Sequence, residues 1–367
     1  FTTLYPNDIQ MQHGIFVEQR LRKLLRNNTI EAKVVAPIPW FPFRSKVFGG
    51  YSKYAKVEQK ENRFGVDVYH PRYMVIPKLG MSMAPFFLVI SMYPFIKKII
   101  KQGYDFDLID AHYYYPDGIA AAILGKLLNK PVTITARGSD INLLSSYSLP
   151  KKMILWAATQ VRASITVSEA LRSKLQLLGV DKETIFTLRN GVDLDLFHPT
   201  SMVAMKNTHT KANKIILTVG NLIELKGHHL VIESLLQLPK YQLLIVGDGG
   251  MSSSLKRQVK ELGLEERVEF LGCLNQQQLV EVYNTAGVLI LASSREGMPN
   301  VLLESMACGT PVIATQVGGI PEIITQPEAG VLIKERTAKA TADAVKKLFS
   351  DYPDRKATRK YAENFSW

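Results

Sequence analysis

The chain has 367 residues, of which 46% are hydrophobic and 21% are charged, proportions typical of a soluble globular protein. A single hydrophobic core usually stops growing at roughly 250 to 300 residues, so we expect two domains. The two cysteines, Cys273 and Cys308, both lie in apolar surroundings. A disulfide framework is therefore not expected, and a reducing compartment, the cytoplasm, is favoured.

The formal net charge of +12 is concentrated in the first half of the chain. Residues 1–200 hold 26 Lys and Arg against 16 Asp and Glu, whereas residues 201–367 hold 19 against 17. Such a basic half can meet nucleic acid, anionic lipid or a phosphorylated substrate. Because no nucleic-acid-binding module is recognisable, we expect no nucleic-acid partner and favour lipid or phosphate.

The start of the chain has the pattern of an α/β domain. Residues 1–6 look like the tail of a strand, so we expect that residues upstream of this numbering are missing, and residues 15–27 have helical amphipathic spacing. The apolar side of that helix consists of Phe16, Leu21, Leu24 and Leu25. Gly14, at the helix start, either lets the backbone approach a phosphate or only makes a tight turn.

Residues 79–96 carry no charge and are followed by a pair of lysines. The run is slightly shorter than the roughly 20 residues that span a bilayer, and Pro85 and Pro94 interrupt it. We expect a buried helix, with an interfacial membrane helix as the alternative. The preceding residues 37–73, rich in proline, aromatic and basic residues, predict a loop with short strands of the kind that recognises substrates.

Strands and helices alternate clearly from residue 107 onward. Strands are predicted at residues 107–111, 131–136, 163–167 and 184–188, and helices at residues 117–128, 149–159 and 168–178. Ser168 is the predicted N-cap of the last of these helices. Residues 201–213, which are polar and poor in large apolar side chains, form the predicted linker.

The alternation restarts after the linker. Strands are predicted at residues 214–219, 241–246, 268–271, 287–292 and 310–315, and helices at residues 227–237, 251–262, 275–284, 299–308 and 337–349, the last clear one. The predicted fold class is therefore α/β, with two Rossmann-like parallel-sheet domains, 1–200 and 214–367. Because ligands of such sheets lie beyond the carboxyl ends of the strands, we expect a substrate between the two domains.

Residues 293–322 are the stretch most suggestive of function. Glu296 lies in the turn after a buried strand, Glu304 lies on the following helix, and Pro299 fits the first turn of that helix. The free amides at a helix start carry roughly half a positive charge and suit a phosphate. Because carboxylates can accept hydrogen bonds from sugar hydroxyls, the stretch suggests a nucleotide-sugar site.

Two further glycine-containing loops follow predicted strands of the second half. The loop V-G-N-L-I-E-L-K-G contains Gly220, Asn221 and Lys226, and the loop V-G-D-G-G contains Gly247 and Gly249. The Lys226 ammonium can lie beside a phosphate that backbone amides already hold. Each loop alone is common in α/β proteins, but three in succession are much more specific.

Together these motifs resemble the family-4 type of retaining glycosyltransferases, of glycosyl transferases group 1, which have the GT-B architecture. The resemblance is strongest over residues 215–322, including E-G-M-P-N-V-L-L-E-S-M-A-C-G-T-P-V-I-A-T. It extends more loosely to Q-H-G at 12–14, R-G-S-D at 137–140 and N-G-V-D at 190–193. It implies an acceptor-binding first domain and a second domain that binds the nucleotide sugar.

The resemblance also implies roles for individual residues. Glu296 would contact the donor sugar, Glu304 the ribose hydroxyls, and Lys226 the diphosphate, which Gly14 would approach from the other domain. The other residues expected at the donor are Gly220, Asn221, Gly247, Gly249, Met298, Pro299, Asn300, Val301 and Leu302. Transfer would proceed with retention through an oxocarbenium-like state, the leaving phosphate taking the acceptor's proton.

This chain departs from the family pattern in two places. Asn221 stands where many relatives have arginine, so Lys226 must carry more of the diphosphate charge. Arg137 stands where many relatives have histidine near the donor sugar. Its planar guanidinium can keep a polar contact to sugar or phosphate and is counted with the catalytic residues, but it cannot act as a base at neutral pH. The family's C-terminal crossing helix also looks cut short.

The expected partners are a nucleoside-diphosphate sugar, with UDP favoured, and a glycan or glycolipid acceptor. The basic first half and the apolar run favour a lipid-linked or polysaccharide acceptor at the inner face of a bacterial membrane, with an anionic lipid surface as a candidate partner. A soluble acceptor is the alternative. No metal is expected. Asp105-x-Asp107 and Asp193-x-Asp195 imitate a metal-binding D-x-D but lie before a strand and beside the linker. His228 and His229 are adjacent and point in different directions, so they make a poor metal pair. We expect them to be solvated, with a contact to the donor as the alternative.

Three alternatives remain open from the sequence. A nucleotide-sugar epimerase or a phosphorylase can have the same fold, and acceptor-dependent release of free nucleoside diphosphate would separate these from a transferase. A sugar-nucleotide-binding protein without turnover is favoured only by the missing cation at Asn221.

Overall fold

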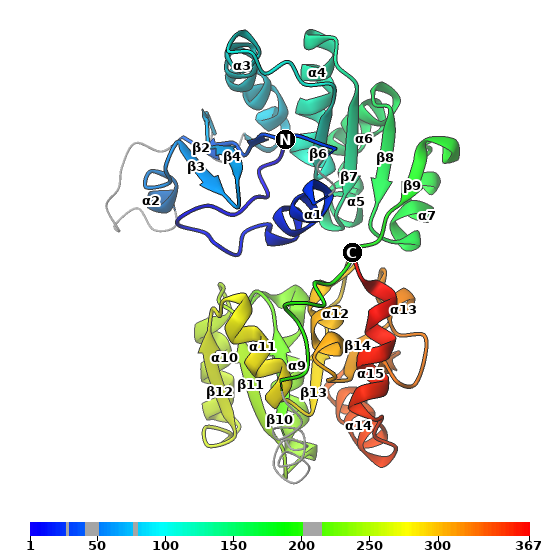
Figure 1. Ribbon diagram of the computed structural model, residues 1–367. Coiled ribbons are helices and arrows are strands. Elements are labelled where there is room, and N and C mark those ends of the chain that lie inside the picture. The colour runs from blue at the N-terminus through cyan, green and yellow to red at the C-terminus, as the bar shows by residue number, and fades with distance from the viewer. Residues whose placement is uncertain (27–28, 41–50, 76–79, 201–214) are drawn as a thin grey trace. The chain divides into compact units, whose positions relative to one another are not determined.

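The computed structural model describes residues 1–26, 29–40, 51–75, 80–200 and 215–367 (Figure 1). They form two compact units, Phe1–Arg189, here the first unit, and Asn190–Trp367, the second unit. The predicted linker, residues 201–213, lies outside the described residues. Each unit is built on a parallel sheet with helices, as the alternation of strands and helices predicts.

The first unit has its main sheet in the order β6-β7-β8-β9, all parallel. Its strands are β1 (Val34–Val35), β2 (Ile38–Pro39), β3 (Lys60–Arg63), β4 (Val66–Tyr69), β5 (Arg72–Tyr73), β6 (Ile109–His112), β7 (Val132–Ala136), β8 (Ala163–Thr166) and β9 (Ile185–Thr187). Its helices are α1 (Ile15–Leu25), α2 (Tyr51–Tyr54), α3 (Gly80–Lys101), α4 (Ile119–Leu128), α5 (Ser139–Asn142), α6 (Ser148–Gln160) and α7 (Glu169–Leu177). Ser168 is the N-cap of α7, as predicted, because its side chain accepts a hydrogen bond from the Leu171 amide.

The first six residues are not a regular strand, although the sequence suggested the tail of one. Within this described segment, the Thr2 amide donates to the Val35 carbonyl at 3.1 Å, and the His112 amide donates to the Phe1 carbonyl at 3.2 Å. The segment therefore lies between β1 and β6 and bonds to both, but too few ladder bonds form for a strand.

Two expectations about buried helix faces are wrong. The segment predicted as a buried helix, residues 79–96, falls largely on α3, which buries only one face, with Met83 and Ile90 46% and 69% exposed. In α1 the predicted core residue Leu24 is 42% exposed, whereas Glu18 is buried. Glu18 is buried because it accepts a hydrogen bond from Arg63 of β3, which satisfies its charge.

The second unit has a parallel sheet in the order β12-β11-β10-β13-β14-β15. Its strands are β10 (Ile215–Val219), β11 (Gln242–Val246), β12 (Val268–Gly272), β13 (Val288–Leu291), β14 (Val312–Thr315) and β15 (Gly330–Ile333). Its α-helices are α9 (His228–Ser234), α10 (Ser252–Glu261), α11 (Gln276–Thr285), α12 (Asn300–Ala307), α13 (Ile320–Ile323), α14 (Ala338–Ser350) and α15 (Arg355–Ala362). Counted along the chain, this is the 3-2-1-4-5-6 order of a dinucleotide-binding sheet.

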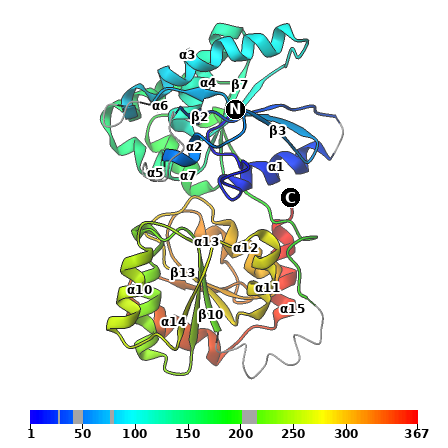
Figure 2. The same cartoon turned by 90° about the vertical axis from the view of Figure 1, so that its left-hand side faces the viewer.

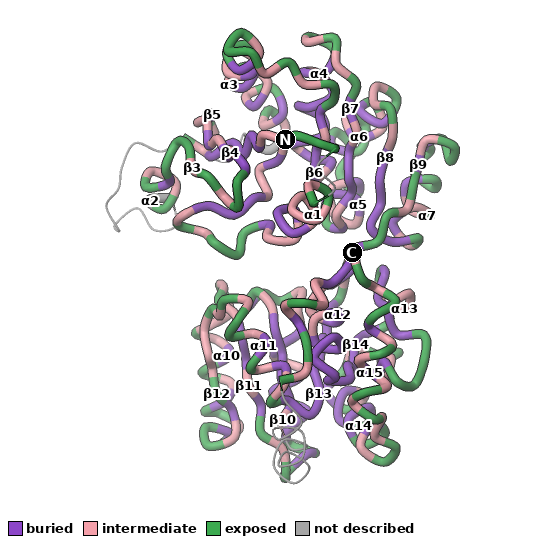
Figure 3. Tube along the Cα trace, in the orientation of Figure 1, coloured by how far each residue is buried: buried purple, intermediate pink, exposed green. Residues whose placement is uncertain are grey.

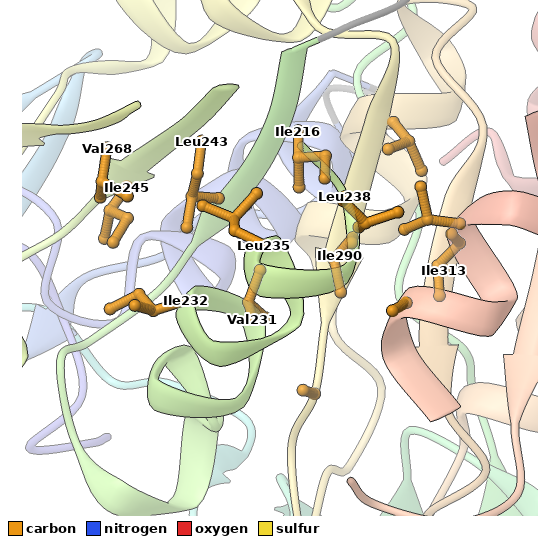
Figure 4. Packing of buried hydrophobic residues seen from close by; sticks show 14 of the residues in the cluster. Ile216, Val231, Ile232, Leu235, Leu238, Leu243, Ile245, Val268, Ile290 and Ile313 are labelled. Carbon is orange, nitrogen blue, oxygen red and sulfur yellow. The ribbon is translucent and has the colours of Figure 1, made fainter. Parts of the chain in front are cut away.

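Both faces of this sheet are covered. Helices α10 and α14 lie on one face, and α11, α12 and α15 lie on the other (Figure 2). Side chains of β10, β11 and β13 pack against α9 in the core of the first of these faces (Figure 4), and every residue of β13 and β14 is buried. Strands enclosed on both sides need continuous apolar runs, which is why they were readable from sequence.

The last helix that is clear from the sequence, residues 337–349, corresponds to α14 and is not the last helix of the second unit. Helix α15 follows, and its Arg359 donates to the carbonyls of Phe197, Ala307 and Leu194. This arginine therefore ties α15 to the turn that opens the second unit. Side-chain hydrogen bonds from Arg359 help to hold α15 in place, so the helix needs few apolar residues. Its apolar pattern is therefore too short to be recognised in the sequence.

Candidate functional site

The predicted donor loops meet at one point of the second unit's sheet. Strands β10 and β13 are neighbours, but the chain visits β11 and β12 between them, so the strand order reverses there. Crevices at such switch points, beyond the carboxyl ends of the strands, are where α/β sheets bind ligands. The loop carrying Lys226 leaves β10, and the turn carrying Glu296 leaves β13, so both side chains belong to this switch point.

The glycines of the first two loops allow them to pack against each other. A Cβ on Gly247, whose φ is +134°, would lie 1.9 Å from the carbonyl oxygen of Gly220, and a Cβ on Gly249 would lie 2.5 Å from the carbonyl oxygen of Leu222. The Leu222 amide donates to the Asp248 carbonyl at 2.9 Å. Gly220, Gly247 and Gly249 are thus brought together as predicted, and close backbone packing accounts for the latter two.

Lys226 and Glu296 form an ion pair at the switch point. The Lys226 Nζ donates to Glu296 Oε1 at 2.7 Å, and Ser293 Oγ donates to the same oxygen at 2.6 Å. The aliphatic stem of Lys226 packs over Gly220: a Cβ on Gly220 would lie 3.5 Å from Lys226 Cδ. The two side chains are only 20% and 11% exposed, so the pair is shielded from most competing water. This places a fixed cation and a fixed carboxylate side by side.

The backbone on both sides of this pair is braced. A Cβ on Gly318, whose φ is +55°, would lie 2.0 Å from the carbonyl oxygen of Glu296, so the loop after β14 packs directly on the Glu296 turn. Arg336 donates to the carbonyls of Ala292 and Glu224, at 2.8 and 2.9 Å. It thereby links the end of β13 to the 3₁₀ turn η6 (Glu224–Lys226), which carries the lysine. Sequence reasoning missed Arg336, since no local motif marks it.

The start of α12 follows the Glu296 turn. Pro299 is the N-cap residue, one position earlier than the first-turn site predicted for it, and Asn300 is the first helical residue. The Asn190 side chain donates to Asn300 Oδ1 at 2.9 Å and to the Met298 carbonyl at 3.4 Å. The predicted run from Met298 to Leu302 therefore spans the start of a helix, whose first backbone N–H groups point back toward the end of β13 at the switch point.

Glu304 lies on α12, about one turn after its first residue. Tyr283 of α11, itself fully buried, donates its hydroxyl to Glu304 Oε2 at 2.9 Å. Burial raises the pKa of Glu304 to about 7, and the hydrogen bond from Tyr283, which favours the carboxylate, offsets only part of that shift. Sequence reasoning missed Tyr283 because nothing in its own segment marks it.

The raised pKa of Glu304 predicts how stability depends on pH. The folded-state pKa of about 7 lies above the usual 4.5, so the folded state holds this proton more tightly than the unfolded chain does. The contribution of Glu304 to stability is therefore present below pH 4.5 and is lost as the pH rises through 7. Glu304→Gln, which keeps an acceptor for Tyr283, should flatten the decline of Tm between pH 5 and 8 by several degrees. An unchanged slope in calorimetric scans would contradict the assignment.

In the first unit, Asp140 organises the R-G-S-D turn. Its carboxylate accepts hydrogen bonds from the backbone amides of Tyr114, Arg137, Gly138 and Ile141. Four amide donors satisfy the charge of this fully buried side chain. The aspartate of the motif therefore has a structural role: it holds the backbone that presents Arg137.

The side chain of Arg137 is held by a buried relay. Its Nη2 donates to His112 Nδ1 at 2.7 Å, and His112 Nε2 faces Asp110 Oδ2 at 3.2 Å. Burial lowers the pKa of His112 to about 4, so the ring is neutral and can accept from the guanidinium. Burial and the neighbouring Arg20 lower the pKa of Arg137 to about 9, which leaves it cationic at neutral pH.

Gly14 precedes the helix whose Phe16 contacts Arg137. It is the N-cap of α1 with φ +68°, and a Cβ there would lie 2.4 Å from the carbonyl of Leu4. Two residues further on, the ring of Phe16 lies 5.1 Å from the Arg137 guanidinium. The tight turn of Gly14 is therefore confirmed, and its approach to a phosphate stays a prediction.

The residues set aside as decoys have other partners. His228 is buried, not solvated as expected: its Nδ1 contacts Thr218 Oγ1 at 3.1 Å and its Nε2 the Asn221 carbonyl at 3.2 Å. Asp105 pairs with Lys130 at 2.7 Å. Among the residues that the structure describes, no group of three or more His, Cys, Asp or Glu is placed to hold a metal ion.

Comparison with known proteins assigns the chain to a family. Residues 20–196 match the family Glycosyltransferase Family 4, and residues 204–365 match Glycosyl transferases group 1. The chain is 29% identical to the putative teichuronic acid biosynthesis glycosyltransferase TuaC of Bacillus subtilis, over 94% of this chain and 87% of that protein. It is also 29% identical to the N-acetyl-alpha-D-glucosaminyl L-malate synthase of Bacillus anthracis, over 69% and 68% of the two chains.

A solved structure agrees with the fold. Anabaena HepE in complex with UDP-glucose superposes with a TM-score of 0.67 at 21% identity, over 82% of this chain and 83% of that chain. The order of the strands, the loops at the switch point and these matches all indicate the same family and fold. The chain belongs to the family-4 glycosyltransferases and has the GT-B fold.

Proposed function

We propose that this glycosyltransferase moves a sugar from a nucleoside-diphosphate sugar to a lipid-linked or growing polysaccharide acceptor, with retention of configuration and without a metal ion. The observation that carries the proposal is the Lys226–Glu296 pair, 2.7 Å apart at the switch point of the second unit. An ammonium has three N–H donors, so its bond to Glu296 leaves donors for diphosphate oxygens. UDP is the favoured nucleotide, and the UDP-glucose complex of HepE supports this choice.

In this mechanism the protein acts mainly by electrostatics. As the sugar–phosphate bond breaks, negative charge grows on the diphosphate, and Lys226 and the amides at the start of α12 stabilise it. The leaving phosphate takes the proton of the acceptor hydroxyl, which attacks the same face of the sugar. Glu296 and Glu304 hold sugar and ribose hydroxyls instead of acting as the acid and base pair of a glycoside hydrolase. For Arg137, which is cationic at neutral pH, the proposed role is a polar contact to sugar or phosphate.

The acceptor class rests on charge and on a relative. The excess of basic residues in 1–200 suits an acceptor that carries phosphate, or the anionic lipids around it, at the cytoplasmic face of a membrane. The role in teichuronic acid biosynthesis that the name of the Bacillus subtilis relative states is compatible with a polysaccharide acceptor.

A donor panel tests the proposal. UDP, GDP, ADP and dTDP and their sugars are first ranked by thermal shift, where UDP compounds should give the largest increase in Tm. Transfer is then scored by acceptor-dependent release of nucleoside diphosphate, and the anomeric configuration of the product by NMR. Activity should survive EDTA. An inverted product, or activity lost in EDTA and restored by Mg²⁺ or Mn²⁺, would contradict the corresponding part.

A further inference from the structure

Helix α3 of the first unit has one face packed and one face exposed. Leu88, Met92, Ile96 and Ile99 are buried, and the helix contacts α4 and β5. Figure 3 shows buried and exposed residues alternating along it. The buried positions recur at intervals of three or four residues, as one side of a helix requires.

The exposed face of α3 is divided along its length. Its first half carries Met83, Phe86 and Ile90, which are 46%, 41% and 69% exposed. Its last turns carry Lys97, Lys98 and Lys101, all exposed. Spacings of three and four residues place Met83, Phe86, Ile90, Lys97 and Lys101 on one stripe. Apolar side chains followed by lysines on a single stripe match the two layers of a bilayer surface: acyl chains and anionic headgroups.

The packed face of α3 argues against a membrane-spanning role for this helix. Residues Ser82–Lys101 are long and apolar enough to span a bilayer by length and composition. Spanning would require α3 to leave the unit and expose Leu88 and Met92, which are 0% exposed. The exposed stripe alone can enter the headgroup region while the packed face keeps its contacts, as in interfacial helices.

We propose that the exposed stripe of α3 docks the protein on an anionic lipid bilayer. Met83, Phe86 and Ile90 enter the boundary between headgroups and acyl chains, and Lys97, Lys98 and Lys101 contact lipid phosphates. Charge complementarity argues for lipid, since the lysines adjoin the apolar residues and residues 1–200 carry the basic excess. The inference builds on the proposed function, because the stripe would hold the enzyme at the membrane that carries its acceptor. Its test is separate, since lipid binding is measured without sugar transfer.

Vesicle flotation of the full chain tests this surface. Vesicles of phosphatidylcholine with phosphatidylglycerol should float the protein at low salt, and pure phosphatidylcholine vesicles should not. Replacing Lys97, Lys98 and Lys101 by glutamine should lower the partition coefficient by roughly a hundredfold. Phe86→Ser with Ile90→Ser should lower it at least tenfold and leave the salt dependence in place. Far-UV circular dichroism and Tm check that each variant is folded.

Matched controls sit elsewhere on the chain. Replacing Lys256, Arg257 and Lys260 on the exposed side of α10 by glutamine removes the same charge, and Leu177→Ser with Leu236→Ser removes two exposed leucines. Both controls should bind vesicles as the unchanged protein does. Equal binding by the α3 variants and their controls would overturn the proposal. So would a concentration-dependent dimer that Phe86→Ser with Ile90→Ser abolishes in the absence of lipid, because the stripe would then be covered by a second copy.

Discussion

Lys226→Ala is expected to lower kcat/KM for the nucleotide sugar by a factor of roughly one hundred or more, the usual cost of a lost charge-stabilising group. The ammonium is held 2.7 Å from Glu296, so it is positioned before any donor arrives. The loss should fall mainly on kcat, because the diphosphate gains charge as the bond breaks. Steady-state kinetics of nucleotide release measure it. A near-normal rate would show that Lys226 does not stabilise the diphosphate.

A double-mutant cycle separates two explanations of such a loss. If Lys226 only holds Glu296 in place, Lys226→Ala should add nothing in the Glu296→Gln background. If it stabilises the diphosphate, as we propose, the double variant should be far slower than Glu296→Gln alone. Lys260→Ala, at an exposed lysine of α10, controls for the loss of one positive charge and should leave the rate unchanged.

Gly318→Ala should lower kcat/KM by roughly a hundredfold, the scale expected for a catalytic group moved by about 1 Å. The new Cβ would lie 2.0 Å from the carbonyl oxygen of Glu296, and since the neighbouring atom is backbone, the Glu296 turn must move. The shift would break the geometry of the Lys226–Glu296 pair. Kinetics together with thermal unfolding measure both consequences.

Gly263 offers a control for backbone strain. Its φ of +64° is close to the +55° of Gly318, but a Cβ there meets no atom within 4 Å. Gly263→Ala should therefore cost about 1 kcal/mol of stability from the left-handed conformation alone and leave activity intact. If both variants lost activity equally, the strain of the left-handed backbone would be the cause. The close packing of Gly318 on Glu296 would then have no catalytic importance.

The fold could be predicted because its signals are local. The apolar runs of β13 and β14 follow from burial on both faces, and Ser168 caps α7 through a bond three residues away. The N-cap Asn275 of α11 forms a capping box with Gln278, which is also only three residues away. Period and capping act within one element, so a sequence contains them in full.

The braces of the site could not be predicted in this way. Arg336 reaches Glu224 across 112 positions of the sequence, and the Asn190 side chain reaches Asn300 across 110. Neither contact produces a periodic pattern in the sequence, because each depends on which strands become neighbours in the sheet. For the same reason Tyr283, the partner of Glu304, was missed.

Residues 293–322 show how the two contributions divide. The sequence by itself determined that a strand, a turn with Glu296 and a helix with Glu304 follow one another, since apolar period and turn residues are local properties. Only the tertiary structure decided that Lys226 meets Glu296 and that Gly318 presses on its turn. It likewise decided that one side of α3 stays exposed, because burial depends on which partner surface a helix finds. Hydrophobic spacing specifies the faces of an element, whereas packing specifies what covers them.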